Sequence, residues 1–213
     1  AQTKYFATVI IANESLWAGT KVTNYGIFFT TFHFEDDEIN TVPYGFTAVS
    51  GDWHITEDSN GNHIYTGIDT DDNNPAITIF RNRTHAFKFS IKFMIDSMSG
   101  QSWETRILLW YQNSQNYYYI KITKFSTQYI LVHNGLETIL YTKMVETSGG
   151  ELHTLKAVHA GDALIIYLDD TFLFPVSLIN IAFENGYWGL YIMNHEPAAL
   201  TTVNFDDICL EIP

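Results

Sequence analysis

The sequence predicts an all-β protein, a two-sheet antiparallel sandwich of the jelly-roll type with an extra N-terminal strand. Apolar and polar residues alternate along many short segments, and no segment shows an apolar helical stripe bounded by caps. Clusters of Asn, Asp, Ser and Gly separate these segments at short intervals, as in sandwiches of short strands. The chain has 213 residues, 46% of them hydrophobic and 15% aromatic, which is enough for one sizeable core and too apolar for disorder.

The clearest strand is predicted between Phe87 and Ile95. Phe89, Ile91 and Phe93 fall on the same face as the two end residues, because side chains in a strand alternate with a period of two. This face is expected to pack on a core, and the polar residues between are expected to face outward.

A series of hairpins is expected after this strand. The Asn-Gly pair at 134–135 is a strong signal for a two-residue turn, and the Asp-Asp pair at 169–170 marks another turn. Segments 57–61 and 69–75, rich in Asp, Asn and Gly, are expected to be exposed loops. The other predicted strands are residues 106–111, 117–123, 129–133, 138–142, 152–159, 163–168, 171–176, 187–193 and 202–212.

The charge of the chain excludes one class of partner. Lys and Arg number 11 and Asp and Glu 24, which gives a formal net charge of −13. Such a field repels phosphate backbones and anionic membranes, so no nucleic-acid partner is expected. No apolar stretch reaches the roughly 18 residues that a membrane span needs. The single cysteine, Cys209, excludes an intramolecular disulfide framework.

We expect a secreted protein of the extracellular space or the cell surface. The chain opens on Ala1 and Gln2 without a basic n-region, as it would after removal of a signal peptide. Asn13 and Asn82 each begin an N-x-S/T sequon, so a glycoprotein modified at both positions is expected.

Short landmark segments follow one another along the chain in a recognisable order. They are residues 34–37 (FEDD), 51–55 (GDWHI), 87–95, 117–120 (YYYI), 153–158 (HTLKAV), 166–170 (IYLDD), 186–190 (GYWGL) and 204–208 (NFDDI). Their order and spacing resemble the concanavalin A-like lectin/glucanase superfamily, in its laminin-G-like and carbohydrate-binding-module branch. The resemblance runs from about residue 32 to the C-terminus.

The resemblance implies a jelly-roll domain over residues 25–213, preceded by an N-terminal strand and linker over residues 1–24. It does not assign an activity, because this superfamily includes lectins, adhesion modules, glycosidases, lyases and spacers. The function expected first is that of a secreted, non-catalytic surface protein that binds carbohydrate or mediates cell adhesion.

Enzymatic alternatives find less support in the sequence. Glucanases of the superfamily carry Glu-x-Asp-x-x-Glu on one strand, and this run is absent. The carboxylates of segment 35–38 are consecutive, so alternate ones point to opposite faces. Residues 103–106 (WETR), and Tyr119 and Lys121 followed by Gln128, resemble alginate-lyase strands, but the Arg-x-Glu-x-Arg pattern is missing. A polysaccharide lyase or glycoside hydrolase stays an alternative, and no catalytic residue is assigned.

A structural calcium ion is the one cofactor expected. The resemblance implies that carboxylates near the first strand meet carboxylates near the last strand, and carboxylate oxygens are the ligands that Ca²⁺ prefers. The alternative is two ordinary acidic turns. The expected ligands are Glu35, Asp36, Asp37, Asp206 and Asp207.

Aromatic residues beside amides indicate where a glycan would bind. The apolar face of a sugar ring packs on Trp or Tyr rings, and polar side chains bind its hydroxyl groups. The segments around one predicted hairpin combine both kinds of residue, although aromatic strands also pack in cores. The expected ligand-binding residues are Trp110, Tyr111, Asn116, Tyr117 and Tyr119.

Residues 4–12 form an apolar, strand-like run before the region of resemblance. The run can pair within its own sheet, or it can be donated to a neighbouring subunit and build a pilus-like filament. In the second case the protein is a structural subunit and its partners are copies of itself. The residues expected to lie in this intersubunit strand are Tyr5, Phe6, Val9, Ile10 and Ile11.

Overall fold

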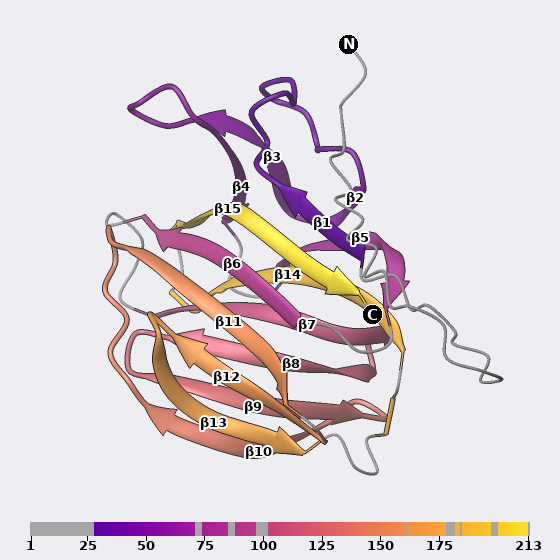
Figure 1. Cartoon of the computed structure of the whole chain (residues 1–213). Helices are drawn as coiled ribbons and strands as arrows, with labels where there is room; N and C mark the ends of the chain where they lie inside the picture. Colours follow the sequence, from indigo (N-terminus) through magenta and orange to yellow (C-terminus); the bar gives the residue numbers. More distant parts are fainter. Residues whose placement is uncertain are drawn as a thin grey trace, which may run out of the picture.

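The computed structural model describes residues 28–70, 74–84, 88–96, 102–160, 162–177, 182–183, 185–196 and 200–212 (Figure 1). Every regular element in these ranges is a β-strand, and no described helix is long and apolar enough to cross a membrane. The predicted N-terminal strand 4–12, the sequon residue Asn13 and the expected domain boundary near residue 25 lie outside the described residues.

The strands are β1 (Phe28–Phe32), β2 (Phe46–Ser50), β3 (Asp52–Glu57), β4 (His63–Asp69), β5 (Ala76–Thr84), β6 (Lys88–Ile95), β7 (Trp103–Asn113), β8 (Asn116–Thr123), β9 (Ser126–His133), β10 (Leu136–Met144), β11 (Leu152–Ala160), β12 (Ala163–Leu168), β13 (Thr171–Ser177), β14 (Gly186–Asn194) and β15 (Thr201–Ile212).

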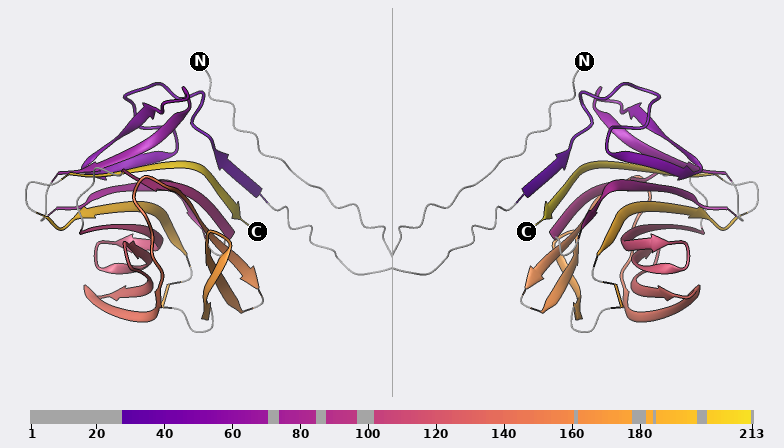
Figure 2. Two further views of the ribbon diagram at one scale, coloured as in Figure 1. Left: turned by 90° about the vertical axis from the view of Figure 1, so that its left-hand side faces the viewer. Right: turned by 90° about the vertical axis from the view of Figure 1, so that its right-hand side faces the viewer.

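The strands form two antiparallel sheets that stack face to face (Figure 2). The seven-stranded sheet has the order β10-β9-β8-β7-β14-β5-β2. The eight-stranded sheet has the order β13-β12-β11-β6-β15-β4-β3, and β1 also pairs with β15. This arrangement confirms the predicted all-β jelly-roll sandwich.

The core lies between the two sheets, and β6 shows how the sequence pattern produces it. Phe89, Ile91, Phe93 and Ile95 are buried in the core cluster, as the alternation predicts. The residues between them are half-buried on the outer face. Large aromatic side chains supply much of the remaining core, and burying each removes about 150–250 Å² of surface from water. The largest fully buried side chains include Trp110, Trp188, Tyr65, Tyr119 and Phe205.

Two hairpin turns confirm their sequence signals. Asn134 and Gly135 both have positive φ, 53° and 77°, as a two-residue turn with right-handed strand twist requires. Asp169 and Asp170 adopt the same region, with φ of 50° and 60°. Short polar residues tolerate this conformation better than other side chains, which explains why these pairs occupy the turns.

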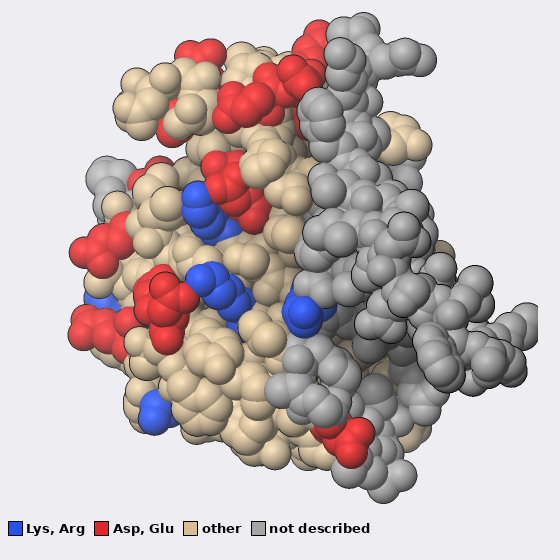
Figure 3. Space-filling view, viewed as in Figure 1, with Lys and Arg blue, Asp and Glu red and all other residues tan. Residues whose placement is uncertain are grey.

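The ionic groups on the outer side of the eight-stranded sheet are mixed in sign. Figure 3 shows Lys and Arg side chains next to carboxylates on this face. Lys92 pairs with Asp207, and the Lys156 Nζ lies 2.6 Å from Asp170 Oδ1. Although the chain has a net charge of −13, the acidic side chains on this face are partly neutralised by neighbouring basic ones, and the face is not uniformly negative.

Candidate functional site

The candidate site lies on the outer face of the seven-stranded sheet, where a second buried cluster forms on the side away from the main core. Its buried apolar members come from β7, β8, β9 and β14, and three half-buried residues pack against them. Residues two apart on one strand share a face, so Glu104, Arg106 and Leu108 of β7 all lie on this side. The members are Leu108, Tyr117, Tyr119, Ile130, Val132 and Tyr191, with Ile77, Tyr111 and Met193 against them.

A buried ionic cluster stands at the centre of this face. The Arg106 Nε–H donates to Glu104 Oε1 at 2.5 Å, and a second guanidinium nitrogen also pairs with that oxygen. Lys121, which faces Arg106 across the β7–β8 ladder, pairs with Glu104 Oε2. His195 Nε2 lies 3.1 Å from the same oxygen. The Glu104 side chain is fully buried, so this one carboxylate holds three nitrogen-bearing side chains together.

The ionic cluster fixes the charge state of its members. Burial by itself raises the pKa of Glu104, but Arg106 and Lys121 favour the carboxylate and leave the net pKa below its ordinary value. Burial lowers the pKa of Arg106, and the Glu104 carboxylate more than reverses this effect. Both groups are therefore charged at neutral pH, as a buried pair must be to hold its geometry.

Two tyrosine rings enclose the guanidinium of Arg106. The Arg106 Cζ lies 4.4 Å from the centre of the Tyr119 ring and 4.2 Å from that of Tyr191, and a cation is attracted to the face of each ring at such distances. The Tyr119 hydroxyl donates to Glu137 Oε1 at 2.8 Å. Burial raises the pKa of both tyrosines far above the ordinary value, so their hydroxyl groups remain protonated.

The tyrosines continue as a row toward the end of β7. The ring centres of Tyr117 and Tyr119 are 5.7 Å apart, and those of Tyr111 and Tyr117 are 5.4 Å apart. Tyr119 is fully buried, Tyr117 is at the limit of burial, and Tyr111 is half-buried. The row therefore opens to solvent at Tyr111, which is half-buried. The next residue, Gln112, is bonded to the backbone, because its Nε2 donates to the carbonyl oxygens of Trp110 and Asn185.

Trp110 does not lie on this face, which corrects the sequence-based assignment. Its side chain is 2% exposed and packs in the main core between the sheets, edge-on to Tyr118 at 5.7 Å. The β7–β8 register shifts between Leu109 and Asn113, and Trp110 has φ of 50°. A β-bulge of this kind reverses the alternation. Leu109 and Trp110 both point inward, and Tyr111 is turned to the outer face.

Asn116 is engaged in the turn rather than displayed for a ligand. Its Nδ2 donates to Asn113 Oδ1 at 3.1 Å, and its Oδ1 accepts from the backbone N–H of Asn134 at 3.1 Å. These bonds join the β7–β8 turn to the β9–β10 turn. Of the five predicted ligand-binding residues, the structure thus brings Tyr111, Tyr117 and Tyr119 together on one face and gives Asn116 a role in holding the turn.

The predicted calcium ligands are not gathered around one point. Asp207 lies in a bulge of β15 and pairs with Lys92 and with His33 Nδ1, the latter at 2.5 Å. Asp206 is close enough to Glu35 for the two carboxylates to repel each other, and burial is the main cause that raises the pKa of Asp206. No group of three or more His, Cys, Asp or Glu side chains in the described part of the chain could hold a metal ion.

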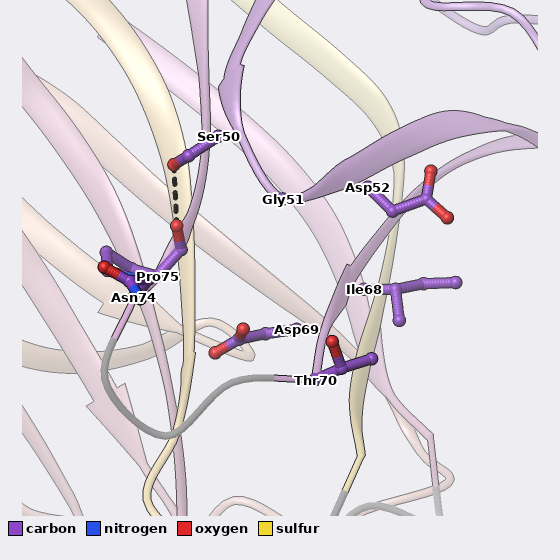
Figure 4. Close-up of a pocket in the computed structure, with 8 residues that line it drawn as sticks. All are labelled: Ser50, Gly51, Asp52, Ile68, Asp69, Thr70, Asn74 and Pro75. Carbon is purple, nitrogen blue, oxygen red and sulfur yellow. Dashed lines mark hydrogen bonds between the residues drawn. The ribbon is translucent and has the colours of Figure 1, made fainter.

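A pocket of about 430 Å³ lies where β2 meets β3 and β4 leads toward β5 (Figure 4). The Ser50 hydroxyl donates to the Pro75 carbonyl at 2.6 Å, and Asp69 Oδ2 accepts from the backbone N–H of Asn194 at 2.7 Å. Asp69 is 2% exposed, so the first residue of the predicted loop 69–75 is instead buried at the end of β4. Its carboxylate joins β4 to the end of β14. The pocket is lined by Ser50, Gly51, Asp52, Ile68, Asp69, Thr70, Asn74 and Pro75.

The ionic cluster was not predicted, although the sequence contains two signals for it. Glu104 and Arg106 are two residues apart on a strand, so they had to share a face. Lys121 and Gln128 were noted only for a resemblance to lyase strands, and Tyr119 was noted for that resemblance and as an expected ligand-binding residue. The pairing of Arg106 with Lys121, and of Lys121 with Gln128, places these residues side by side.

Comparison with known proteins confirms the fold. No family model matches the chain, and no curated protein matches it. Among solved structures, a carbohydrate-binding module of family CBM66 from Bacillus subtilis is 18% identical, with a TM-score of 0.59 over 77% of this chain and 93% of that one. A family 16 endo-glucanase from Bacteroides ovatus is 9% identical, with a TM-score of 0.63 over 85% and 99%.

A third similar structure is the potassium-bound carbohydrate recognition domain of Emp46p. It is 11% identical, with a TM-score of 0.60 over 78% of this chain and 88% of that one. All three likenesses are at the level of fold, and together they confirm the concanavalin A-like jelly roll that the sequence landmarks predicted.

Proposed function

We propose that the protein binds carbohydrate on the outer face of the seven-stranded sheet, at the open end of the tyrosine row. The observation that carries this proposal is the row itself. The ring centres of Tyr111 and Tyr117 lie 5.4 Å apart at the end of the row where Tyr111 is half-buried. A sugar needs such a surface for its C–H face, with hydroxyl partners at the rim.

The ionic cluster supports this proposal by making the surface rigid. The ion pairs of Glu104 with Arg106 and Lys121 join β7 to β8 on the same face, and the Arg106 guanidinium lies over the ring of Tyr119. Binding then orders few side chains, and a preorganised site loses less free energy on binding. The names of the similar structures, a carbohydrate-binding module and a carbohydrate recognition domain, are consistent with such a role.

The charge states favour binding over catalysis at this face. A glycosidase needs one carboxylic acid that is protonated at working pH, and the pKa of Glu104 is lowered instead. A lyase needs a base that accepts a proton, and the pKa of Tyr119 is raised, with its hydroxyl donating to Glu137. The groups that resemble lyase strands are thus held in the wrong protonation states for that reaction. We propose an extracellular, adhesive or glycan-binding module.

The test is a glycan array, followed by calorimetry on any glycan that binds. The variants are Tyr111→Ala and Tyr117→Ala, with Tyr44→Ala as a control because Tyr44 is an exposed tyrosine on a different segment. Loss of one stacking ring should weaken binding at least ten-fold, and the control should bind as wild type does. An array without signal, or equal affinity in all variants, would refute the proposal.

A second candidate function is that of a structural subunit. The observation that favours it is a long exposed edge strand in the seven-stranded sheet, which is the kind of edge to which another chain can add. Glycan binding and assembly use different features of the fold and can be tested separately.

A further inference from the structure

Sheet edges differ in how well they are protected from pairing with another chain. The outer side of β3 is bonded by a loop, because Asn40 N donates to Ile55 O and Ile55 N donates to Thr41 O, both at 2.9 Å. β13 carries Pro175, which has no N–H to offer. β2 has five residues and a register shift between Ala48 and Ser50. Covering loops, prolines, short strands and bulges are the usual protections of edge strands.

β10 is an edge with less protection. It has nine residues, all of them exposed, and within the described ranges it pairs with β9 alone. Its apolar side chains are open to solvent, with Leu136 75%, Met144 71% and Ile139 57% exposed. Its protective features are the charged residues Glu137 and Lys143 and a register shift between Ile139 and Tyr141. Such a long, apolar edge is a template for one more strand.

The chain itself contains a segment with matching properties. Residues 4–12 (KYFATVIIA) also number nine, are rich in β-branched and aromatic residues and carry one charge. Nine residues of strand span about 30 Å at the usual rise, so the two segments can pair over their full lengths. Aromatic and β-branched neighbours across a ladder stabilise the pairing.

The topology favours a second copy as the source of this strand. β1 begins at Phe28, which pairs with Ile212 of the eight-stranded sheet. Figure 1 shows β1 and β10 at opposite ends of the molecule. Consecutive strands usually lie next to each other, so a strand before β1 would normally be placed near β1 and not near β10. A neighbouring molecule can present the segment to β10 without this constraint.

We propose that residues 4–12 of one molecule add as a strand to the free edge of β10 in a second molecule. Donor and acceptor are different surfaces, so each molecule can give one strand and receive one, and the contact repeats into an open filament. Backbone hydrogen bonds of the added strand replace those that the β10 edge makes with water. This inference does not depend on glycan binding.

Two full-length variants separate the partners of this contact. Ile139→Lys with Met144→Lys places charges on the acceptor edge and leaves the donor intact. Val9→Pro with Ile10→Pro removes one N–H from each side of the donor strand and leaves the acceptor intact. Leu152→Lys is the control, because Leu152 is 61% exposed but belongs to β11 in the other sheet.

Sedimentation velocity over a range of concentrations is the measurement. For wild type and the control, the sedimentation coefficient should increase with protein concentration as larger assemblies form. Each double variant alone should associate at least ten-fold more weakly. An equimolar mixture of the two double variants should form a heterodimer, since one supplies the strand and the other the edge. The proposal is overturned if wild type stays monomeric, if the proline variant assembles like wild type, or if the mixture stays monomeric.

Hydrogen exchange keeps the proposal testable if the lysine variant does not fold. The amides of residues 136–144 that point away from β9 should exchange at least ten-fold more slowly in assembled wild type than in the monomeric proline variant. Equal exchange of these amides overturns the proposal. So does their protection in a wild-type monomer, because the segment would then pair within its own chain.

Discussion

Replacement of Glu104 by Gln should strongly destabilise the fold. Glu104 is fully buried, and Arg106, whose side chain is 9% exposed, would lose its charged partner, as would Lys121. Removing one member of a buried ion pair typically costs about 3–5 kcal/mol, because the remaining charge stays buried without compensation. For a domain of this size, each kcal/mol lowers the melting temperature by about 2–4 °C, so a decrease of about 6–20 °C is expected.

The matched control is Glu137→Gln. Glu137 also contacts Arg106, at 3.4 Å, but its side chain is 52% exposed. Surface ion pairs contribute about 0–1 kcal/mol, so this variant should melt within a few degrees of wild type. Urea unfolding followed by tryptophan fluorescence gives the free energies, and circular dichroism gives the melting temperatures.

A double-mutant cycle then tests whether the loss comes from the pair. Arg106→Met should cost less in the Glu104→Gln background than in wild type, because the unpaired charge has already been created. The difference should be about 2 kcal/mol or more. If Glu104→Gln unfolds within about 1 kcal/mol of wild type, or if the two substitutions are additive, the ionic cluster does not stabilise the fold and this reasoning fails.

Four further predictions follow from the same structure. The pKa of Glu104 is lower in the folded state than its unfolded value of about 4.3, so the Glu104 carboxylate contributes its full stabilisation above that pH. This contribution is lost as the pH falls through the folded pKa. The free energy of unfolding of Glu104→Gln should therefore fall less steeply in acid than that of wild type, and the same pH dependence in both proteins would contradict this prediction. Burial and repulsion by Asp207 raise the pKa of Asp206, so the charged carboxylate is disfavoured in the folded protein. Asp206→Asn should therefore increase the free energy of unfolding at pH 7 by less than about 1 kcal/mol. A lower urea midpoint for this variant would contradict the prediction. Trp110→Ala should lower the free energy of unfolding by about 3–5 kcal/mol, and an unchanged midpoint would place this side chain outside the core. Gly51 has φ of 74°, and a Cβ there would lie 2.2 Å from the Cβ of Ala76, so Gly51→Ala should cost more than about 1 kcal/mol, whereas a neutral effect in thermal unfolding would contradict the close approach.

Strand positions were predictable because their signals are local. The alternation through β6 and the Asn134-Gly135 turn depend on neighbouring residues only, and both were confirmed. β12 begins and ends at the predicted residues, 163 and 168. β10 extends beyond its predicted range of 138–142 by two residues at each end, because ladder pairing with β9 continues to the turn.

The candidate site was only partly predictable, because its geometry depends on register. No local pattern indicates that the alternation of β7 breaks at Trp110, so Trp110 was assigned to the wrong face. Asp207 was expected to be a cation ligand, and in the structure Lys92 from a different strand reaches it across the β15–β6 ladder. Both cases concern which residues meet across strands that are distant in sequence.

The sequence alone therefore determined the all-β class, the hairpin turns and the apolar face of each regular strand. These features follow from the intrinsic preferences of residues and from the period of two in a strand. Tertiary structure alone decided that Glu104 and Arg106 meet Lys121 and His195, and that β10 lies at an exposed edge. Strand order, bulges and register set these contacts, and they are properties of the assembled sheets that no single segment of sequence contains.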